Sequence, residues 1–338
     1  MNLKFLELQA AERLLYFEQA GLRRNLSPII MEKDFWVSWL LGVLFRSSFA
    51  GELVFKGGTS LSKVFGVIER FSEDIDLSLS PDFLKLPKVG ESRNQANKWM
   101  MEAEAACRTF VELQLATELE KTVASVLGGR GGNWFEFLMD PATHSPVLLF
   151  HYPTTFPGQF AYLKRSVKLE FGSLTEQMPV GRHPVRPWLA EIFEEGFTDW
   201  HGEVVALELE RTFWEKATIL HAEHHRPLTE LTPDRFSRHY ADTASLSMHP
   251  SFESFIQSHA LRESVVRWKS KFFGSTWARY DLAIPGTFRL IPPSHRVPEL
   301  RRDYQAMRDM YLNEPISFDE VLEILDEIEH RINRLVDG

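Results

Sequence analysis

The pattern of apolar and polar positions over the first 48 residues predicts two helices. The stretch MNLKFLELQAAERLLYFEQAG has apolar residues at helical spacing, with acidic and basic residues set between them. Charges inside this pattern indicate an amphipathic helix and exclude a signal peptide. A second helix is expected to begin beside Pro28, after Asn25 or Ser27, and to run to Phe45.

The next segment predicts a strand, a turn, a helix and a second strand. GELVFKGG is a short apolar run closed by Gly57 and Gly58, which indicates a buried strand leading into a tight turn. A helix is expected from Thr59, whose hydroxyl suits a cap. DIDLSL then alternates polar and apolar residues, so Asp74 and Asp76 should lie on one face of a strand. This connection would bring the turn and both aspartates to one edge of a sheet.

The remaining pattern predicts an α+β fold. A long helical stretch covers residues 92–125, and three strands follow at NWFEFLM, PVLLFHY and RSVKLEFGSL. Residues 178–187 read as a proline-rich loop, residues 203–209 as a last strand, and most of the remainder as helices. We therefore expect a small mixed β-sheet with N-terminal helices in residues 1–205, and a helical C-terminal domain in residues 206–338.

Composition and charge narrow the class of protein. The 338 residues carry a net charge of −9 and one cysteine, Cys107, which excludes an intrachain disulfide and a thiolate zinc cluster. No apolar run approaches the roughly 18–20 residues of a membrane helix, so we expect a cytoplasmic protein without membrane contact. Basic residues gather locally, for example at Arg267, Lys269 and Lys271. Such clusters indicate either a local basic face or ordinary solvated helices.

The glycine turn and the aspartate pair together suit phosphate chemistry. Carboxylates on one rigid element can hold Mg²⁺ or Mn²⁺, and two such cations can clamp the attacking and leaving oxygens of a phosphoryl transfer. Glycines before a helix let backbone amides approach a nucleoside triphosphate closely. Asp74 and Asp76 are therefore candidate metal ligands, and Gly57 to Ser60 a candidate triphosphate turn. The competing interpretation of the aspartates is a solvated polar strand face.

The stretch FKGGTSLSKVFGVIERFSEDIDLSL resembles the AbiEii/AbiGii family of toxin nucleotidyltransferases. This family is a branch of the DNA polymerase beta-like superfamily and is related to MenT-type toxins. It places a Gly-Gly or Gly-Ser turn before an Asp-x-Asp strand, here Gly57, Gly58, Asp74 and Asp76. Many superfamily members have serine where this chain has Gly58, so Ser60 or backbone amides would have to bind the phosphate.

Three later stretches are also similar to the family: RSVKLEFGS, ELERTFWEKATILH and RFSRHYADTASL. The candidate catalytic residues are Asp74, Asp76, Lys168 and Glu170. The candidate nucleotide-binding residues are Gly57, Gly58, Thr59, Ser60, Lys63, Glu210, Glu215, Lys216, Arg238 and Asp242. Ordinary alternatives remain open: Lys63 and Lys168 as surface lysines, Glu170, Glu215 and Lys216 in structural ion pairs, and Arg238 with Asp242 as a helix pair.

The resemblance implies a metal-dependent enzyme that moves a nucleoside monophosphate from a nucleoside triphosphate to an acceptor. It implies RNA as the acceptor, at the 3′ end of a tRNA, and a role as the toxin of a toxin–antitoxin or phage-defence system. The expected partner is a cognate antitoxin, which in this family is often a winged-helix transcription regulator. Two alternatives are a protein-nucleotidylating enzyme, which the acidic net charge favours, and a nucleotide-binding module without transfer.

A histidine group lies apart from these motifs. His221, His224 and His225 share one helix at a spacing that can bind a transition metal. The segment HAEHH is not HExxH, and no nearby acidic residue or cysteine completes a site. We interpret these histidines as a solvated helix end.

Overall fold

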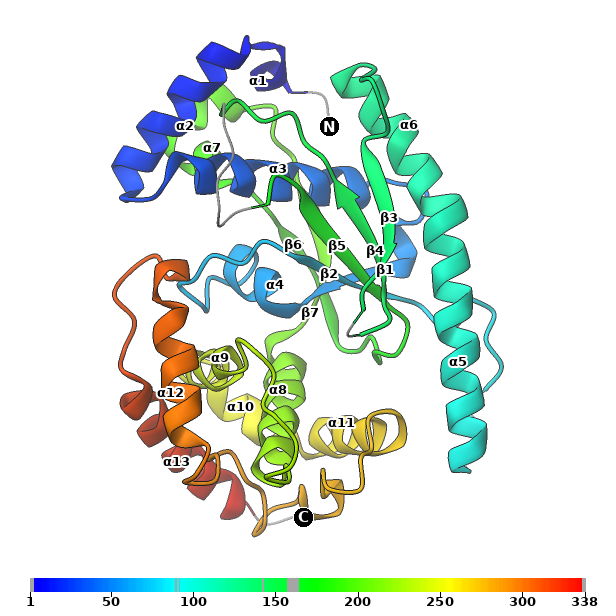
Figure 1. Ribbon diagram of the computed structural model, residues 1–338, viewed down its shortest axis with the longest axis vertical. Coiled ribbons are helices and arrows are strands. Elements are labelled where there is room, and N and C mark those ends of the chain that lie inside the picture. The colour runs from blue at the N-terminus through cyan, green and yellow to red at the C-terminus, as the bar shows by residue number, and fades with distance from the viewer. Residues whose placement is uncertain (1–2, 89, 91, 142, 157–163, 336–338) are drawn as a thin grey trace. The chain divides into compact units, whose positions relative to one another are not determined.

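The computed structural model describes residues 3–88, 90, 92–141, 143–156 and 164–335. The chain divides into two compact units, which are described separately here (Figure 1). The N-unit comprises residues 1–64, 72–89 and 98–206. The C-unit comprises residues 65–71, 90–97 and 207–338, so two short segments from the first third of the chain belong to it.

A seven-stranded sheet in the described residues forms the centre of the N-unit, with the order β3-β4-β5-β2-β1-β7-β6. Its strands are β1 (Leu53–Lys56), β2 (Ile75–Leu79), β3 (Phe135–Met139), β4 (Pro146–Phe150), β5 (Val167–Gly172), β6 (Val180–Pro184) and β7 (Glu203–Leu207). β2 and β5 are parallel, as are β1 and β7, whereas β1–β2, β3–β4 and β4–β5 are antiparallel. The predicted mixed sheet and α+β class are confirmed.

Helices cover the sheet and contribute the core of the N-unit. They are α1 (Lys4–Glu7), α2 (Ala10–Arg24), α3 (Pro28–Leu44), α4 (Gly57–Lys63), α5 (Arg93–Phe110), α6 (Ala116–Leu127) and α7 (Trp188–Ile192). α3 begins at Pro28 as predicted, with Ser27 at the capping position. It crosses one face of the sheet, and its buried Trp36 and Trp39 contact the ring of Phe150 on β4 (Figure 1).

Three local predictions were wrong. The N-terminal segment forms three helices instead of two, because the short α1 ends at Glu7. α4 begins at Gly57, with Lys56 and not Thr59 at its capping position. The segment predicted as a loop contains β6, which is the last strand at one edge of the sheet. Prolines are tolerated at such an edge because the outward N–H groups need no ladder partner.

The C-unit is built from helices in its described residues. They are α8 (Leu209–His224), α9 (Ser237–Ser247), α10 (Phe252–Ile256), α11 (His259–Phe272), α12 (Val297–Ala306) and α13 (Phe318–Asn333). α8 packs against α9, α10 and α11, which explains why most of its residues are buried. Phe213 contacts Phe252, and Trp214 contacts Phe288, within its aromatic core. The predicted helical C-terminal region is present. No helix in the described ranges is both long and apolar enough to cross a bilayer.

Candidate active site

The polar face of the sheet carries the predicted carboxylates. β2 and β5 are parallel neighbours, with Asp76 opposite Glu170 and Ile75 opposite Leu169. Ile75 and Leu169 are fully buried, whereas Asp76 and Glu170 are half-buried. Alternate residues of a strand point to opposite faces, so Asp76 and Glu170 share the face away from α3. Lys168, two residues before Glu170, shares that face.

The glycine turn lies directly against Asp76. Gly57 follows β1, and the last residue of β1, Lys56, is paired with Asp76 in the antiparallel register. Gly57 has φ +81°, and a Cβ there would lie 2.0 Å from Oδ2 of Asp76. A side chain is therefore excluded at Gly57 by backbone conformation and by space. Gly58 is the second residue of α4 and is half-buried.

The hydroxyl groups of Thr59 and Ser60 form hydrogen bonds within the protein. Ser60 donates to the Gly57 carbonyl at 2.8 Å, and Thr59 donates to the backbone carbonyl of Asp74. Thr59 also lies 2.8 Å from the Ser72 hydroxyl. Both side chains are fully buried. Thr59 therefore ties the turn to the start of β2, and Ser60 closes the turn on itself. The first backbone amides of a helix have no acceptor within the helix, so those of α4 are left for a ligand.

Lys168 is held between two carboxylates. Its Nζ lies 2.7 Å from Oε2 of Glu170 and 2.9 Å from Oδ2 of Asp140. The other oxygen of Glu170 accepts a hydrogen bond from Thr143 at 3.2 Å. Burial tends to lower the pKa of Lys168, but the hydrogen bonds to Glu170 and Asp140 outweigh it, so the pKa rises above its usual value. Lys168 therefore keeps its positive charge at this face of the sheet.

Asp74 is largely buried and lies near the negatively charged Glu73 and Glu170. Burial and then the neighbouring Glu73 raise the pKa of its carboxyl group, while the charges of Lys168 and Lys33 partly oppose this shift. Glu170 adds to the rise. The charges of Glu73 and Glu170 repel the ionised form of Asp74, and a cation beside Asp74 would offset this repulsion.

Two residues that contact this site, Asp140 and Lys33, were not predicted from the sequence. Asp140 follows β3 and reaches Lys168 across the hairpin. Lys33 lies within the apolar α3, where its buried amine contacts Glu73 and the Lys164 carbonyl, the latter at 2.9 Å. The sequence signal for Asp140 was its position after a strand that is followed by a hairpin turn. No feature of the local sequence indicates a role for Lys33.

Lys63 forms a buried ion pair with Asp34. Its amine contacts Oδ1 of Asp34, and both side chains are almost completely buried. The amine also lies 4.9 Å from the centre of the Trp188 ring, and the Trp188 amide donates to the other Asp34 oxygen at 2.7 Å. The interpretation as an exposed surface lysine was wrong, and its predicted contact with phosphate stays a prediction.

The remaining candidates belong to the C-unit, where Asp242 is the centre of a buried network. Arg70 donates to both Asp242 oxygens, at 3.0 and 2.9 Å, and Lys216 contacts Oδ2 at 2.9 Å. Burial would raise the pKa of Asp242, but Arg70 and Lys216 together hold it well below its usual value. This geometry gives Asp242 and Lys216 a clear structural role, and their nucleotide binding stays a prediction.

Three further candidates lie on α8 and α9. Glu215 forms an ion pair with Arg211 one turn earlier, at 3.1 Å. Glu210 is the second residue of α8 and Arg238 the second of α9, and both are half-buried. Among the predicted residues, the structure thus groups Gly57 to Ser60 with Asp74, Asp76, Lys168 and Glu170 in the N-unit. It groups Lys216 with Asp242 in the C-unit.

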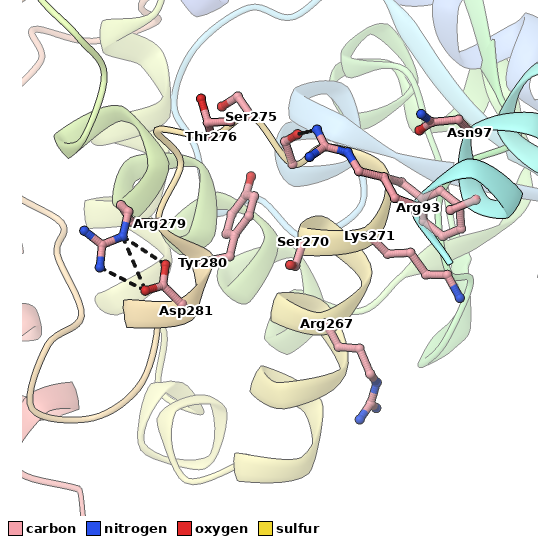
Figure 2. A pocket seen from close by; sticks show the side chains of 13 residues that line it. Arg93, Asn97, Arg267, Ser270, Lys271, Ser275, Thr276, Arg279, Tyr280 and Asp281 are labelled. Carbon is pink, nitrogen blue, oxygen red and sulfur yellow. Dashed lines mark hydrogen bonds and ion pairs between the residues drawn. The ribbon is translucent and has the colours of Figure 1, made fainter. Parts of the chain in front are cut away.

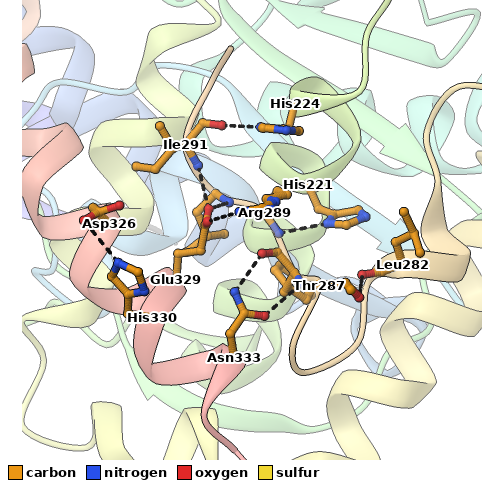
Figure 3. Close-up of polar contacts among 12 residues, drawn as sticks. His221, His224, Leu282, Thr287, Arg289, Ile291, Asp326, Glu329, His330 and Asn333 are labelled. Atoms are coloured by element: carbon orange, nitrogen blue, oxygen red, sulfur yellow. Dashed lines mark hydrogen bonds and ion pairs between the residues drawn. The ribbon is translucent and has the colours of Figure 1, made fainter. Parts of the chain in front are cut away.

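The histidines of α8 do not form a solvated helix end, so that interpretation was wrong. His221 is fully buried, and its Nε2 donates to the Arg279 carbonyl at 2.9 Å. Its Nδ1 accepts from the Arg289 amide at 3.0 Å (Figure 3). Nδ1 of His224 donates to the Ile291 carbonyl. The described part of the chain contains no group of three or more His, Cys, Asp or Glu side chains arranged to hold a metal.

Comparison with known proteins now defines the class. The chain matches the family model described as "Nucleotidyl transferase AbiEii toxin, Type IV TA system" over residues 39–324, which is most of its length. The chain is therefore a nucleotidyltransferase. It belongs to the AbiEii family of toxins from type IV toxin–antitoxin systems, as its motifs predicted. Family membership implies a nucleoside triphosphate substrate and a cognate antitoxin.

A solved structure is also similar. It is MenT4, a nucleotidyltransferase toxin from Mycobacterium tuberculosis H37Rv, with 13% sequence identity and a TM-score of 0.26. The alignment covers 81% of this chain and 94% of MenT4. No curated protein sequence matches this chain significantly.

Proposed function

We propose that this nucleotidyltransferase uses Mg²⁺, or Mn²⁺ in its place, to transfer a nucleoside monophosphate to the 3′ end of a tRNA. The observation that supports the site is the contact between the Gly57 turn and Asp76, with Glu170 beside Asp76 in the sheet. A phosphate-binding turn and a metal-binding carboxylate would need this proximity, because the cation and the triphosphate bind each other.

The donor set fits a hard divalent cation. Asp76 on β2 and Asp74 immediately before it supply oxygen ligands, and a cation would offset the charges of Glu73 and Glu170 that, after burial, raise the pKa of Asp74. Mg²⁺ usually binds through one or two carboxylates, completed by water and substrate phosphates, so no preformed cage of three protein ligands is required. The cation would neutralise phosphate charge and polarise the phosphate oxygens.

The reaction itself is a displacement at phosphorus. The oxygen of the acceptor hydroxyl forms a bond to the α-phosphorus, the bond from that phosphorus to the bridging oxygen breaks, and pyrophosphate leaves. The hydroxyl proton passes to solvent or to a carboxylate. The Gly57 turn would hold the triphosphate through backbone amides, and Lys168 would neutralise charge on the transferring group. Asp140 and Glu170 would hold the Lys168 amine in place.

The proposed acceptor and biological role are supported by membership in a toxin family. A toxin that adds nucleotides to the 3′ end of a tRNA would block its aminoacylation and stop translation. Such a role would place the protein in the cytoplasm, in a toxin–antitoxin or phage-defence system. The cognate antitoxin would be a winged-helix protein in this proposal.

A labelling experiment tests the proposal. Purified protein is incubated with each labelled nucleoside triphosphate in turn, together with total RNA and lysate proteins, with and without EDTA. We expect metal-dependent label in tRNA for the wild type and none for Asp74→Asn or Asp76→Asn. Label in protein would instead support protein nucleotidylation. Binding of nucleotide without transfer to RNA or protein would support the alternative of a nucleotide-binding module.

A further inference from the structure

A basic pocket in the C-unit is lined by none of the candidate catalytic or nucleotide-binding residues. It has a volume of about 620 Å³, within the range of about 300–1,000 Å³ that ligand pockets span (Figure 2). It is lined by the start of α5, whose residues 93–97 belong to the C-unit, by the end of α11 and by the following segment to Asp281. Its charged lining residues are Arg93, Arg267, Lys271, Arg279 and Asp281.

Three of the four cations in this pocket are available to a ligand. Arg279 is neutralised by Asp281 through three hydrogen bonds, at 3.0, 3.3 and 2.9 Å. Among the described residues, Arg93 makes one long contact, of 3.4 Å, to the Gly274 carbonyl. Neither Arg267 nor Lys271 forms an ion pair within the residues that the structure describes. The pocket therefore has an excess of positive charge, in a chain whose net charge is −9.

The placement of Arg267 and Lys271 reinforces this conclusion. They are four residues apart on α11, so they project from the same side of the helix (Figure 2). Like charges at this spacing oppose helix formation. An anion bound between the two side chains would remove the repulsion. The pair therefore favours anion binding, and it does not stabilise the free protein.

Hydroxyl groups complete the lining. Ser270, Ser275 and Thr276 are exposed at the pocket, and Tyr280 is half-buried in its wall (Figure 2). Arginine and lysine together with hydroxyl side chains are the groups that contact phosphate oxygens of nucleic acids. Tyr280 also offers a ring to an unpaired base.

We propose that this pocket binds the sugar-phosphate backbone of the RNA acceptor. The inference rests on the proposed function, since that function supplies the RNA. RNA fits better than an acidic protein partner because the lining is mostly charged and hydroxylic, whereas the centre of a protein interface is mainly apolar. RNA also needs a local positive surface on a chain whose overall charge repels it.

The test compares two double variants that lose the same charge. Arg267→Gln with Lys271→Gln removes two pocket cations. Arg302→Gln with Arg334→Gln removes two exposed arginines of the C-unit that do not line the pocket. Each protein is titrated, without nucleotide, against a labelled RNA hairpin that has a single-stranded 3′ end, at several salt concentrations. Thermal unfolding confirms that both variants are folded.

We expect the pocket variant to bind RNA about tenfold more weakly. The slope of log affinity against log salt should fall by about 1.4–1.8, the value for two lost phosphate contacts. The control should bind like the wild type. Equal binding of the RNA hairpin by the two variants would overturn the inference. Wild-type labelling of tRNA tests the proposed function separately, since it can succeed when the pocket variant binds RNA normally.

Discussion

The carboxylate of Asp76 occupies the space in which a side chain at Gly57 would begin. The built Cβ position lies 2.0 Å from Oδ2, and the φ of +81° is itself unfavourable for any residue other than glycine. The turn and the carboxylate are therefore coupled, so a change in one displaces the other.

Gly57→Ala should abolish nucleotidyl transfer by displacing Asp76. We expect at least a hundredfold loss of kcat/KM and a decrease of about 1–3 kcal/mol in the free energy of unfolding, from backbone strain. The matched control is Gly51→Ala, where nothing lies within 4 Å of the added Cβ. Steady-state kinetics and urea unfolding measure both effects. Normal activity in Gly57→Ala would contradict the proposed arrangement.

Asp140 should act through Lys168. Asp140→Asn removes one of the two carboxylates that hold the amine, so we expect transfer to fall about tenfold, less than in Lys168→Met. Because both changes act on one ammonium group, the double variant should be no slower than Lys168→Met alone. Glu136→Gln on the adjacent β3 is the control, since Glu136 contacts His151. If the double variant lost activity by the product of the two single losses, this coupling would be refuted.

The strands and the glycine turn were predictable because their causes are local. Alternation in DIDLSL follows from one buried and one polar face, and the structure has Ile75 and Leu77 buried with Asp76 half-exposed between them. Gly57 and Gly58 marked the end of β1 because few residues other than glycine leave a strand through a positive φ.

The partners of the site were not predictable, because their causes are distant in sequence. Asp140 is 28 residues from Lys168, and Lys33 is 131 residues from the Lys164 carbonyl that it contacts. Such pairs are set by strand order and helix packing, which local patterns do not specify. The same reason explains His221, whose polar side chain is buried by segments that follow it by more than 50 residues.

Removing the charge of Asp242 should destabilise the C-unit. Asp242→Asn leaves Arg70 and Lys216 buried without a full counter-charge, so we expect a loss of about 3–5 kcal/mol in the free energy of unfolding. Asp309→Asn, an exposed aspartate of the same unit, is the control and should change little. Urea unfolding monitored by tryptophan fluorescence measures both.

The same carboxylate predicts a response to acid. The pKa of Asp242 in the folded protein lies below its unfolded value of 3.8, so its contribution is complete above about pH 4 and is lost as pH falls further. The wild type should therefore lose stability faster than Asp242→Asn between pH 4 and pH 3. Parallel curves for the two proteins in that range would show that the carboxylate does not titrate as expected.

His221 should make stability depend on pH at a higher range. Its Nδ1 must remain unprotonated to accept from the Arg289 amide, and burial, the largest cause, lowers its pKa from 6.5 to about 4. The unfolded chain binds the proton first, so stability is complete above pH 6.5 and decreases as pH falls toward 4. At about 1.4 kcal/mol for each pH unit, the loss approaches about 3 kcal/mol.

The measurement is the difference in unfolding free energy between the wild type and His221→Gln, from pH 7 to pH 4. Glutamine does not titrate, so the wild-type advantage at pH 7 should shrink steadily over this range. His330→Gln is the control, because the His330 side chain is 66% exposed. A constant difference between wild type and His221→Gln would mean that His221 accepts a proton in the folded state, and that the hydrogen bond from Arg289 does not fix its neutral form.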